Sequence, residues 1–189
     1  DAVVVVNDES LNLTQNFSIE GWVWLDNDSN QLRGGTLSSG TWEGWTIVDA
    51  EGDGWDGYMF GVEAAIHTSA SHANWRRLTM LSEQQSAHGN NCSSYQSSSC
   101  YGTVVGRGNL STNQWNHVAV VYNSTTTGSE QLEFYINGEL DVSYPCAFTF
   151  TPNDEPRYIG SEDGGSLTDN SANMSYWDGK IDELGIWKR

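Results

Sequence analysis

Basic residues are scarce in this chain. Only 8 of its 189 residues are lysine or arginine, against 25 aspartates and glutamates, and the formal net charge is −17. Nucleic acids and anionic membrane surfaces attract proteins through clustered lysine and arginine, so this composition argues against both as partners. An acidic surface instead favours cations, basic partners or simple solubility in salty water.

Long apolar runs are also missing. The longest, 2–6, is far shorter than the roughly 20 residues that cross a bilayer as a helix, so no membrane insertion is expected. A chain of this length fits a single domain, 1–189, with enough buried surface for a β-sandwich core. No internal repeat and no linker divides it.

Cysteine is too rare for a disulfide framework. Cys92 and Cys100 flank a serine-rich loop and are spaced so that a bridge can form, whereas Cys146 has the apolar setting of a buried thiol. A Cys92–Cys100 disulfide would place the protein outside the cytosol, and we expect an extracellular or cell-surface location. The alternative is a zinc site with His88, which lacks a fourth ligand at a recognisable spacing.

Alternation of apolar and polar residues is the dominant pattern of the chain. This period of two is typical of a strand with one buried face, and it predicts long strands at 17–25, 115–122, 132–138 and 177–187. Asn137-Gly138 follows an apolar strand, which predicts a hairpin turn. Shorter strands are expected at 3–6, 36–38, 45–49, 58–65 and 77–81.

In the first long predicted strand, 17–25, the alternation places Phe17, Ile19, Val23 and Leu25 on one apolar face. Its other face carries tryptophans, and we expect these to be buried too, as where loops fold over a sheet. The tryptophans assigned to the core are Trp22, Trp24, Trp45, Trp115, Trp177 and Trp187.

Five segments occur in the order that is typical of one family. They are Phe17-Ser-Ile-Glu-Gly-Trp-Val, Trp115-Asn-His-Val-Ala-Val-Val-Tyr, Leu132-Glu-Phe-Tyr-Ile-Asn-Gly, Tyr158-Ile-Gly and Trp177-Asp-Gly-Lys-Ile-Asp-Glu-Leu-Gly-Ile-Trp. With these segments the chain resembles the laminin-G-like branch of the concanavalin A-like proteins. The resemblance implies an all-β fold, a two-sheet antiparallel β-sandwich of the jelly-roll type.

An acidic, glycine-rich segment follows the strand expected at 45–49. Asp49, Glu51, Asp53 and Asp56 supply four carboxylates, and Ca²⁺ prefers six to eight oxygen ligands. The spacing is not that of an EF-hand, because Phe60 stands at the twelfth position. We predict a calcium site here, and the resemblance supports it because laminin-G-like domains often bind one calcium at a loop rim. The alternative is a set of solvated turn residues.

The same segment matches a glycosidase motif in spacing alone. Glu51, Asp53 and Asp56 follow the pattern Glu-x-Asp-x-x-Glu with aspartate in the last place. A catalytic carboxylate pair needs a rigid strand, whereas Gly52 and Gly54 make this segment a turn. We therefore expect no catalytic residues and no enzyme activity.

Nine tryptophans and eight tyrosines exceed what one sandwich core needs. Trp42, Trp55 and Trp75 lie in predicted loops, and Tyr58 and Arg76 adjoin them. Loop aromatics stack on sugar rings or clasp apolar side chains, while arginine pairs with carboxylates, so these five are the predicted ligand-binding residues. The alternative is that loop aromatics form small packing clusters.

These patterns predict an extracellular, calcium-dependent ligand-binding module. Its partner would be a peptide, protein or glycan on a cell surface, and its context a larger adhesin with neighbouring domains. The main alternative is a carbohydrate-binding module of a polysaccharide-degrading enzyme. A glycoside hydrolase and a structural spacer are the remaining alternatives.

Overall fold

The structure of the protein is a computed structural model. It describes residues 2–26, 44–50, 57–63, 76–82, 103–126, 131–145, 150, 152–161 and 176–188. The three cysteines, His88 and the strand expected at 36–38 lie outside these ranges.

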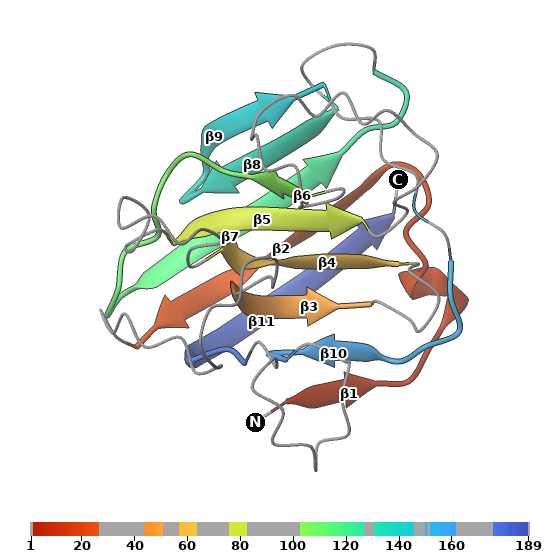
Figure 1. The fold of residues 1–189 in the computed structure, drawn as a ribbon, viewed down its shortest axis with the longest axis horizontal. Coiled ribbons are helices and arrows are strands. Elements are labelled where there is room, and N and C mark those ends of the chain that lie inside the picture. Colours follow the sequence, from red (N-terminus) through yellow and green to blue (C-terminus); the bar gives the residue numbers. More distant parts are fainter. Residues whose placement is uncertain are drawn as a thin grey trace, which may run out of the picture.

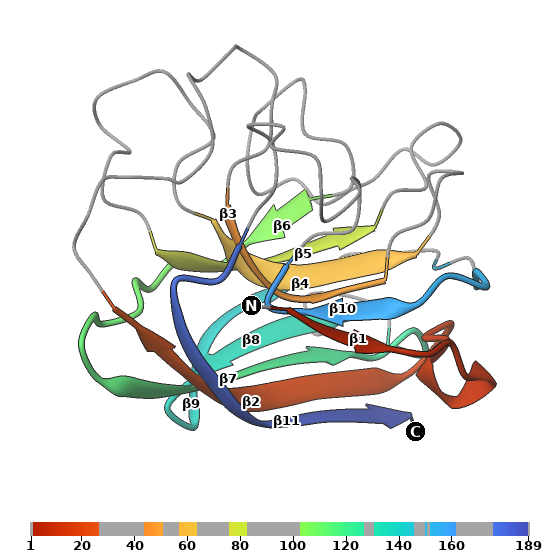
Figure 2. The same cartoon turned by 90° about the horizontal axis from the view of Figure 1, so that it is seen from below.

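Two antiparallel sheets stack as the layers of a sandwich, and their strands run obliquely to each other (Figures 1 and 2). This is the arrangement that twisted sheets adopt when they pack face to face. The first sheet has the order β1-β10-β3-β4-β5-β6. Its strands are β1 (Val3–Val5), β3 (Gly44–Asp49), β4 (Tyr58–Glu63), β5 (Arg77–Ser82), β6 (Thr103–Val105) and β10 (Arg157–Ile159).

The second sheet has the order β11-β2-β7-β8-β9 and is the lower layer in Figure 2. Its strands are β2 (Phe17–Leu25), β7 (Trp115–Tyr122), β8 (Leu132–Ile136), β9 (Glu139–Tyr144) and β11 (Gly179–Lys188). The one helical element of the described residues is the 3-10 turn η1 (Glu9–Leu11), and none of their helices could cross a membrane. The predicted all-β antiparallel sandwich is confirmed.

The turn between β8 and β9 follows the sequence prediction. Asn137 and Gly138 both have positive φ, at 53° and 81°, which is the backbone of a tight hairpin turn. The Asn137 side-chain oxygen also accepts a hydrogen bond from the His117 backbone N–H at 2.9 Å, and the Asn137 backbone N–H donates to the His117 carbonyl at 2.7 Å. The turn is thereby fastened to β7.

The core lies between the sheets and contains the predicted apolar face of β2, so that assignment is confirmed. Four aromatic rings meet at one end of it. The Phe150 ring lies 5.2 Å from Phe17 and 5.3 Å from Tyr122, edge to face, and Tyr58 stacks on Phe17. Burial of large rings supplies much of the apolar stabilisation of a small sandwich.

The expected burial of the strand tryptophans is wrong for three of them. Trp22 is 38% exposed, Trp115 is 39% exposed and Trp187 is 57% exposed. Trp22 points away from the core, because its neighbours Gly21 and Val23 are buried. Trp115 and Trp187 share that outer face, because they lie opposite Trp24 and Ser18 of the same strand. Trp45 and Trp177, by contrast, are partly buried and pack against the core as expected.

Candidate functional site

The predicted loop site lies largely beyond what the structure describes. Trp42, Trp55 and Trp75 of the ligand-binding prediction, and Glu51, Asp53 and Asp56 of the calcium prediction, are outside the described ranges. Asp49, Tyr58 and Arg76 are described, and each has a defined structural environment.

Tyr58 belongs to the core and not to a ligand-binding surface. Its side chain is 2% exposed, stacks on Phe17, and lies with its hydroxyl 3.4 Å from the Leu11 carbonyl, to which it donates. Tyr58 opens β4 and points inward, so a position next to a loop in sequence does not bring its ring to the surface. The prediction that Tyr58 contacts ligand is therefore wrong.

Asp49 is a fully buried carboxylate at the end of β3. The buried Arg157 guanidinium donates to Asn153 Oδ1 at 2.9 Å and also to the Asn12 side chain and the Glu155 carbonyl. The charges of Asp49 and Arg157 both act on the Tyr58 hydroxyl. Asp49 therefore has a buried positive charge in its surroundings before any cation is considered.

Arg76 joins the beginning of β5 to the segment before β7. Its Nε donates to the Leu110 carbonyl at 3.1 Å, and its backbone N–H donates to Asn109 Oδ1 at 3.0 Å. Contact of Arg76 with a ligand stays a prediction. Among the described residues, no group of three or more histidine, cysteine, aspartate or glutamate side chains is placed to hold a metal ion.

The buried Tyr58 makes stability depend on alkaline pH. Burial raises the pKa of Tyr58 to about 12, against the opposing effect of the Arg157 guanidinium, and the Asp49 charge adds to the increase. The unfolded chain releases this proton near pH 10, whereas the folded chain holds it, so stability falls as the pH rises from about 10 to about 12. The loss from this group is about 3 kcal/mol.

Urea unfolding of the wild type and Tyr58→Phe between pH 9 and 12 tests this effect. Phenylalanine has no proton to release, so the variant is expected to show the smaller alkaline decline. Equal declines in the two proteins would contradict the assignment.

A surface that the sequence analysis missed lies on the outer face of the five-stranded sheet. We call it the tryptophan cluster, and it consists of Trp22 and Trp24 on β2 with Trp115 and His117 on β7. Trp24 lies directly opposite Trp115, and Trp22 directly opposite His117, in the antiparallel register. Four rings from two adjacent strands therefore gather on one face.

Ring contacts hold the cluster together. Trp24 and Trp115 meet edge to face with centroids 5.9 Å apart, and Trp22 and His117 do the same at 5.1 Å. Lys180, opposite Trp24 on β11, has its ammonium 5.0 Å from the centre of the Trp24 ring. Such pairs each contribute about 0.5–1.5 kcal/mol and restrict the rings without burying them.

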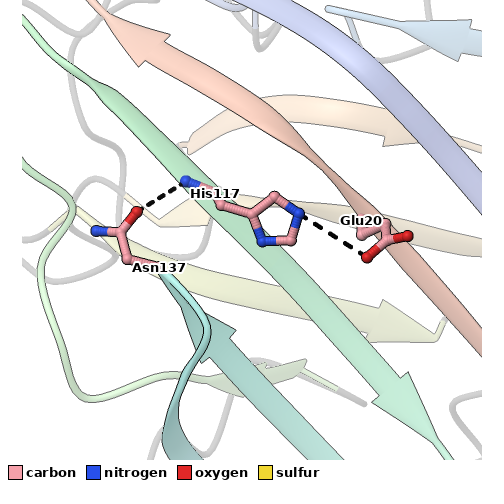
Figure 3. A network of polar contacts seen from close by, with 3 residues as sticks. All are labelled: Glu20, His117 and Asn137. Atoms are coloured by element: carbon pink, nitrogen blue, oxygen red, sulfur yellow. Dashed lines mark hydrogen bonds and ion pairs between the residues drawn. The ribbon is translucent and has the colours of Figure 1, made fainter.

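Polar groups lie beside the rings. His117 Nε2 is 3.8 Å from Glu20 Oε2, and the His117 ring points from β7 toward Glu20 on β2 (Figure 3). The bonds to Asn137 fix the backbone on which that imidazole is carried. The cluster thus presents aromatic surface next to groups that donate and accept hydrogen bonds, the combination that orients a ligand.

A signal for this surface is present in the sequence. Trp22 and Trp24 stand at the same alternate positions of 17–25 as Ser18 and Glu20, so all four share the face of the strand opposite to its apolar face. An antiparallel sheet commonly leaves one face in water. If the polar face of 17–25 is taken as that solvent-exposed face, both tryptophans are placed on the outside of the sandwich.

Comparison with known proteins agrees with the topology. A laminin-G-like family model, described as the concanavalin A-like lectin/glucanases superfamily, matches residues 1–189. No curated protein matches the sequence. A Bacteroides ovatus protein assigned as carbohydrate-binding is similar in structure, with 19% identity and a TM-score of 0.59, over 99% of this chain and 41% of that one.

Two further structures share the fold. Domain 4 of AbnA, an extracellular arabinanase from Geobacillus stearothermophilus solved with arabinotriose, has 17% identity and a TM-score of 0.56, over 99% of this chain and 66% of that one. Domains LG4-5 of the mouse laminin α1 chain have 11% identity and a TM-score of 0.53, over 98% of this chain and 38% of that one. The chain thus spans less than two thirds of the length of the Bacteroides ovatus protein and of the AbnA domain structure. On the family match over its whole length, the chain belongs to the laminin-G-like family of the concanavalin A-like lectin/glucanases superfamily.

Proposed function

We propose that the protein is a carbohydrate-binding module whose binding surface is the tryptophan cluster. One observation carries the proposal: Trp22 and Trp115 each expose more than a third of their surface on adjacent strands of a regular sheet. Indole faces stack on the apolar faces of sugar rings, and strands hold them more rigidly than loops do.

The relatives support a carbohydrate ligand over a peptide. One of the similar structures is assigned as carbohydrate-binding, and another was solved with an arabinose trisaccharide. Because their identity to this chain is below 20%, they guide the choice of ligand class and not of the sugar. We further propose that the module acts outside the cell as part of a larger chain, either an adhesin or a polysaccharide-degrading enzyme, and binds without catalysing.

Affinity electrophoresis against soluble polysaccharides tests this function. The panel is mixed-linkage β-glucan, galactan, arabinan and xylan, with cellulose and chitin tested by sedimentation. Binding is expected for at least one polymer, together with a change in tryptophan fluorescence because exposed indoles become covered. Failure to bind any of the six would refute the proposed function.

Calcium binding is a separate proposal, made for Glu51, Asp53 and Asp56. We assign Asp49 to the Arg157 network and not to the cation. At 100 times its dissociation constant a ligand stabilises the folded state by about 2.7 kcal/mol, so Ca²⁺ is expected to raise Tm by roughly 5–10 °C over EDTA. Calorimetry in both conditions measures it, and an unchanged Tm would refute the site.

Two variants locate the calcium within that segment. Asp53→Asn is expected to remove the calcium-dependent shift in Tm. Asp49→Asn is expected to keep the calcium-dependent shift in Tm. If this variant also loses the shift, Asp49 is a calcium ligand after all. The acidic segment follows β3 of the six-stranded sheet, whereas the tryptophan cluster lies on the five-stranded sheet. Glycan binding is therefore expected to persist when EDTA removes calcium.

A further inference from the structure

Four carboxylates lie on β2 and β11, or at the ends of these strands, on the side of the tryptophan cluster. Glu20 comes two residues before Trp22 on the outer face of β2, and Asp182 lies opposite Trp22 on β11. Asp26 and Asp178 are exposed where β2 ends and β11 begins, joined by the bond from the Asp26 N–H to the Asp178 carbonyl at 3.2 Å.

Within the described ranges, little positive charge offsets these carboxylates. The Lys180 ammonium lies over the Trp24 ring at 5.0 Å, and the whole chain carries a formal charge of −17. Of the residues that the structure describes, an anionic polymer lying along the cluster would meet these four carboxylates and one ammonium that already contacts a ring. Its own carboxylates bring no hydrogen-bond donor, and like charges repel at short range.

Sugar hydroxyls suit the same surroundings. A hydroxyl donates to a carboxylate such as Glu20 and accepts from an imidazole N–H such as that of His117. The two groups are 3.8 Å apart, so neighbouring hydroxyls of one sugar can reach both. The contacts that disfavour a uronate therefore favour an uncharged sugar.

We infer that the tryptophan cluster selects uncharged polysaccharides and rejects polyuronates. This inference rests on the proposed glycan-binding function and narrows its ligand to one class. The proposed ligand of the outer face of the five-stranded sheet is thus a neutral glycan.

Chemically matched polymers test the selectivity. Galactan and β-glucan, which both have free primary hydroxyls, are each used in three forms: native, oxidised at the primary hydroxyls to carboxylates, and oxidised then methyl-esterified to restore neutrality. The oxidised form is expected to bind at least about tenfold more weakly, and the ester to regain most of the affinity. Raising the salt concentration from about 20 to about 500 mM is expected to reduce the difference in affinity between the native and oxidised forms, because salt screens the repulsion between like charges.

One variant links the selectivity to the cluster. Asp182→Asn removes a carboxylate but keeps the oxygen that accepts from the Glu183 N–H at 2.9 Å. It is expected to reduce the ratio of native to oxidised affinity by roughly two- to threefold. An unchanged ratio would contradict the role given to this carboxylate.

The outcomes separate the inference from the function on which it rests. Equal or tighter binding of an oxidised polymer overturns the selectivity and leaves glycan binding intact. An ester that fails to bind also overturns it, because the lost hydroxyl and not the charge then explains the weakening. If no native polymer binds, or if a peptide library alone binds the cluster, both proposals fall.

Discussion

The double variant Trp22→Ala/Trp115→Ala is expected to bind polysaccharide about 100-fold more weakly while remaining folded. Truncation of a central aromatic at a binding surface costs about 1–2 kcal/mol, and two such losses amount to 2–4 kcal/mol. Both side chains lie on the outer face, so no cavity opens in the core. The variant loses one ring contact to Trp24 and one to His117, which lowers stability by about 1–2 kcal/mol.

Trp187→Ala is the matched control for this double variant. Trp187 lies on the same outer face and is more exposed, but it is opposite Ser18, about 13 Å along β2 from Trp22. It is expected to bind like the wild type in titrations followed by affinity electrophoresis. Equal losses in Trp187→Ala and the double variant would mean that any exposed indole suffices, and would remove the cluster as the site.

The architecture was predictable because strand periodicity is set by backbone geometry. Successive side chains of a strand point to opposite faces, so the alternation in 17–25 identified Phe17, Ile19, Val23 and Leu25 as core residues. The Asn137-Gly138 turn was predictable for a similar reason, since its positive φ values suit that pair.

The exposed tryptophans were not predictable from periodicity alone. Alternation tells which residues share a face but not whether a second layer covers that face. Trp22 and Trp115 are apolar, so composition favours burial, and only the stacking of the two sheets leaves their side in water. Their pairing with His117 and Trp24 depends on the register between β2 and β7, which no local pattern contains.

The predicted loop site had a related weakness. Nearness in sequence to an acidic segment made Tyr58 and Asp49 candidates, yet both are strand residues enclosed by the sandwich. Arg157 had no distinguishing sequence signal, although it is a buried cation whose charge, like that of Asp49, acts on the Tyr58 hydroxyl. Long-range contacts decide whether a residue at a strand end serves the loop or the core.

Arg157→Leu is expected to destabilise the protein by about 3–5 kcal/mol, which lowers Tm by on the order of 10 °C. Arg157 is 2% exposed and binds the Asn12 and Asn153 side chains and the Glu155 carbonyl, so leucine leaves these partly buried acceptors without their donor. It also leaves the buried Asp49 carboxylate without the nearby positive charge. Urea unfolding at neutral pH measures the loss.

Two companion variants show which property of Arg157 matters. Arg157→Lys keeps the charge but not the planar fork that reaches several acceptors, so an intermediate loss is expected. Asp49→Asn combined with Arg157→Leu removes both charges, and its loss is expected to be smaller than the sum of the two single losses. Additive losses would mean that the two charges do not interact. A loss below about 1 kcal/mol for Arg157→Leu would contradict the buried network, since it is within the range of an ordinary surface change.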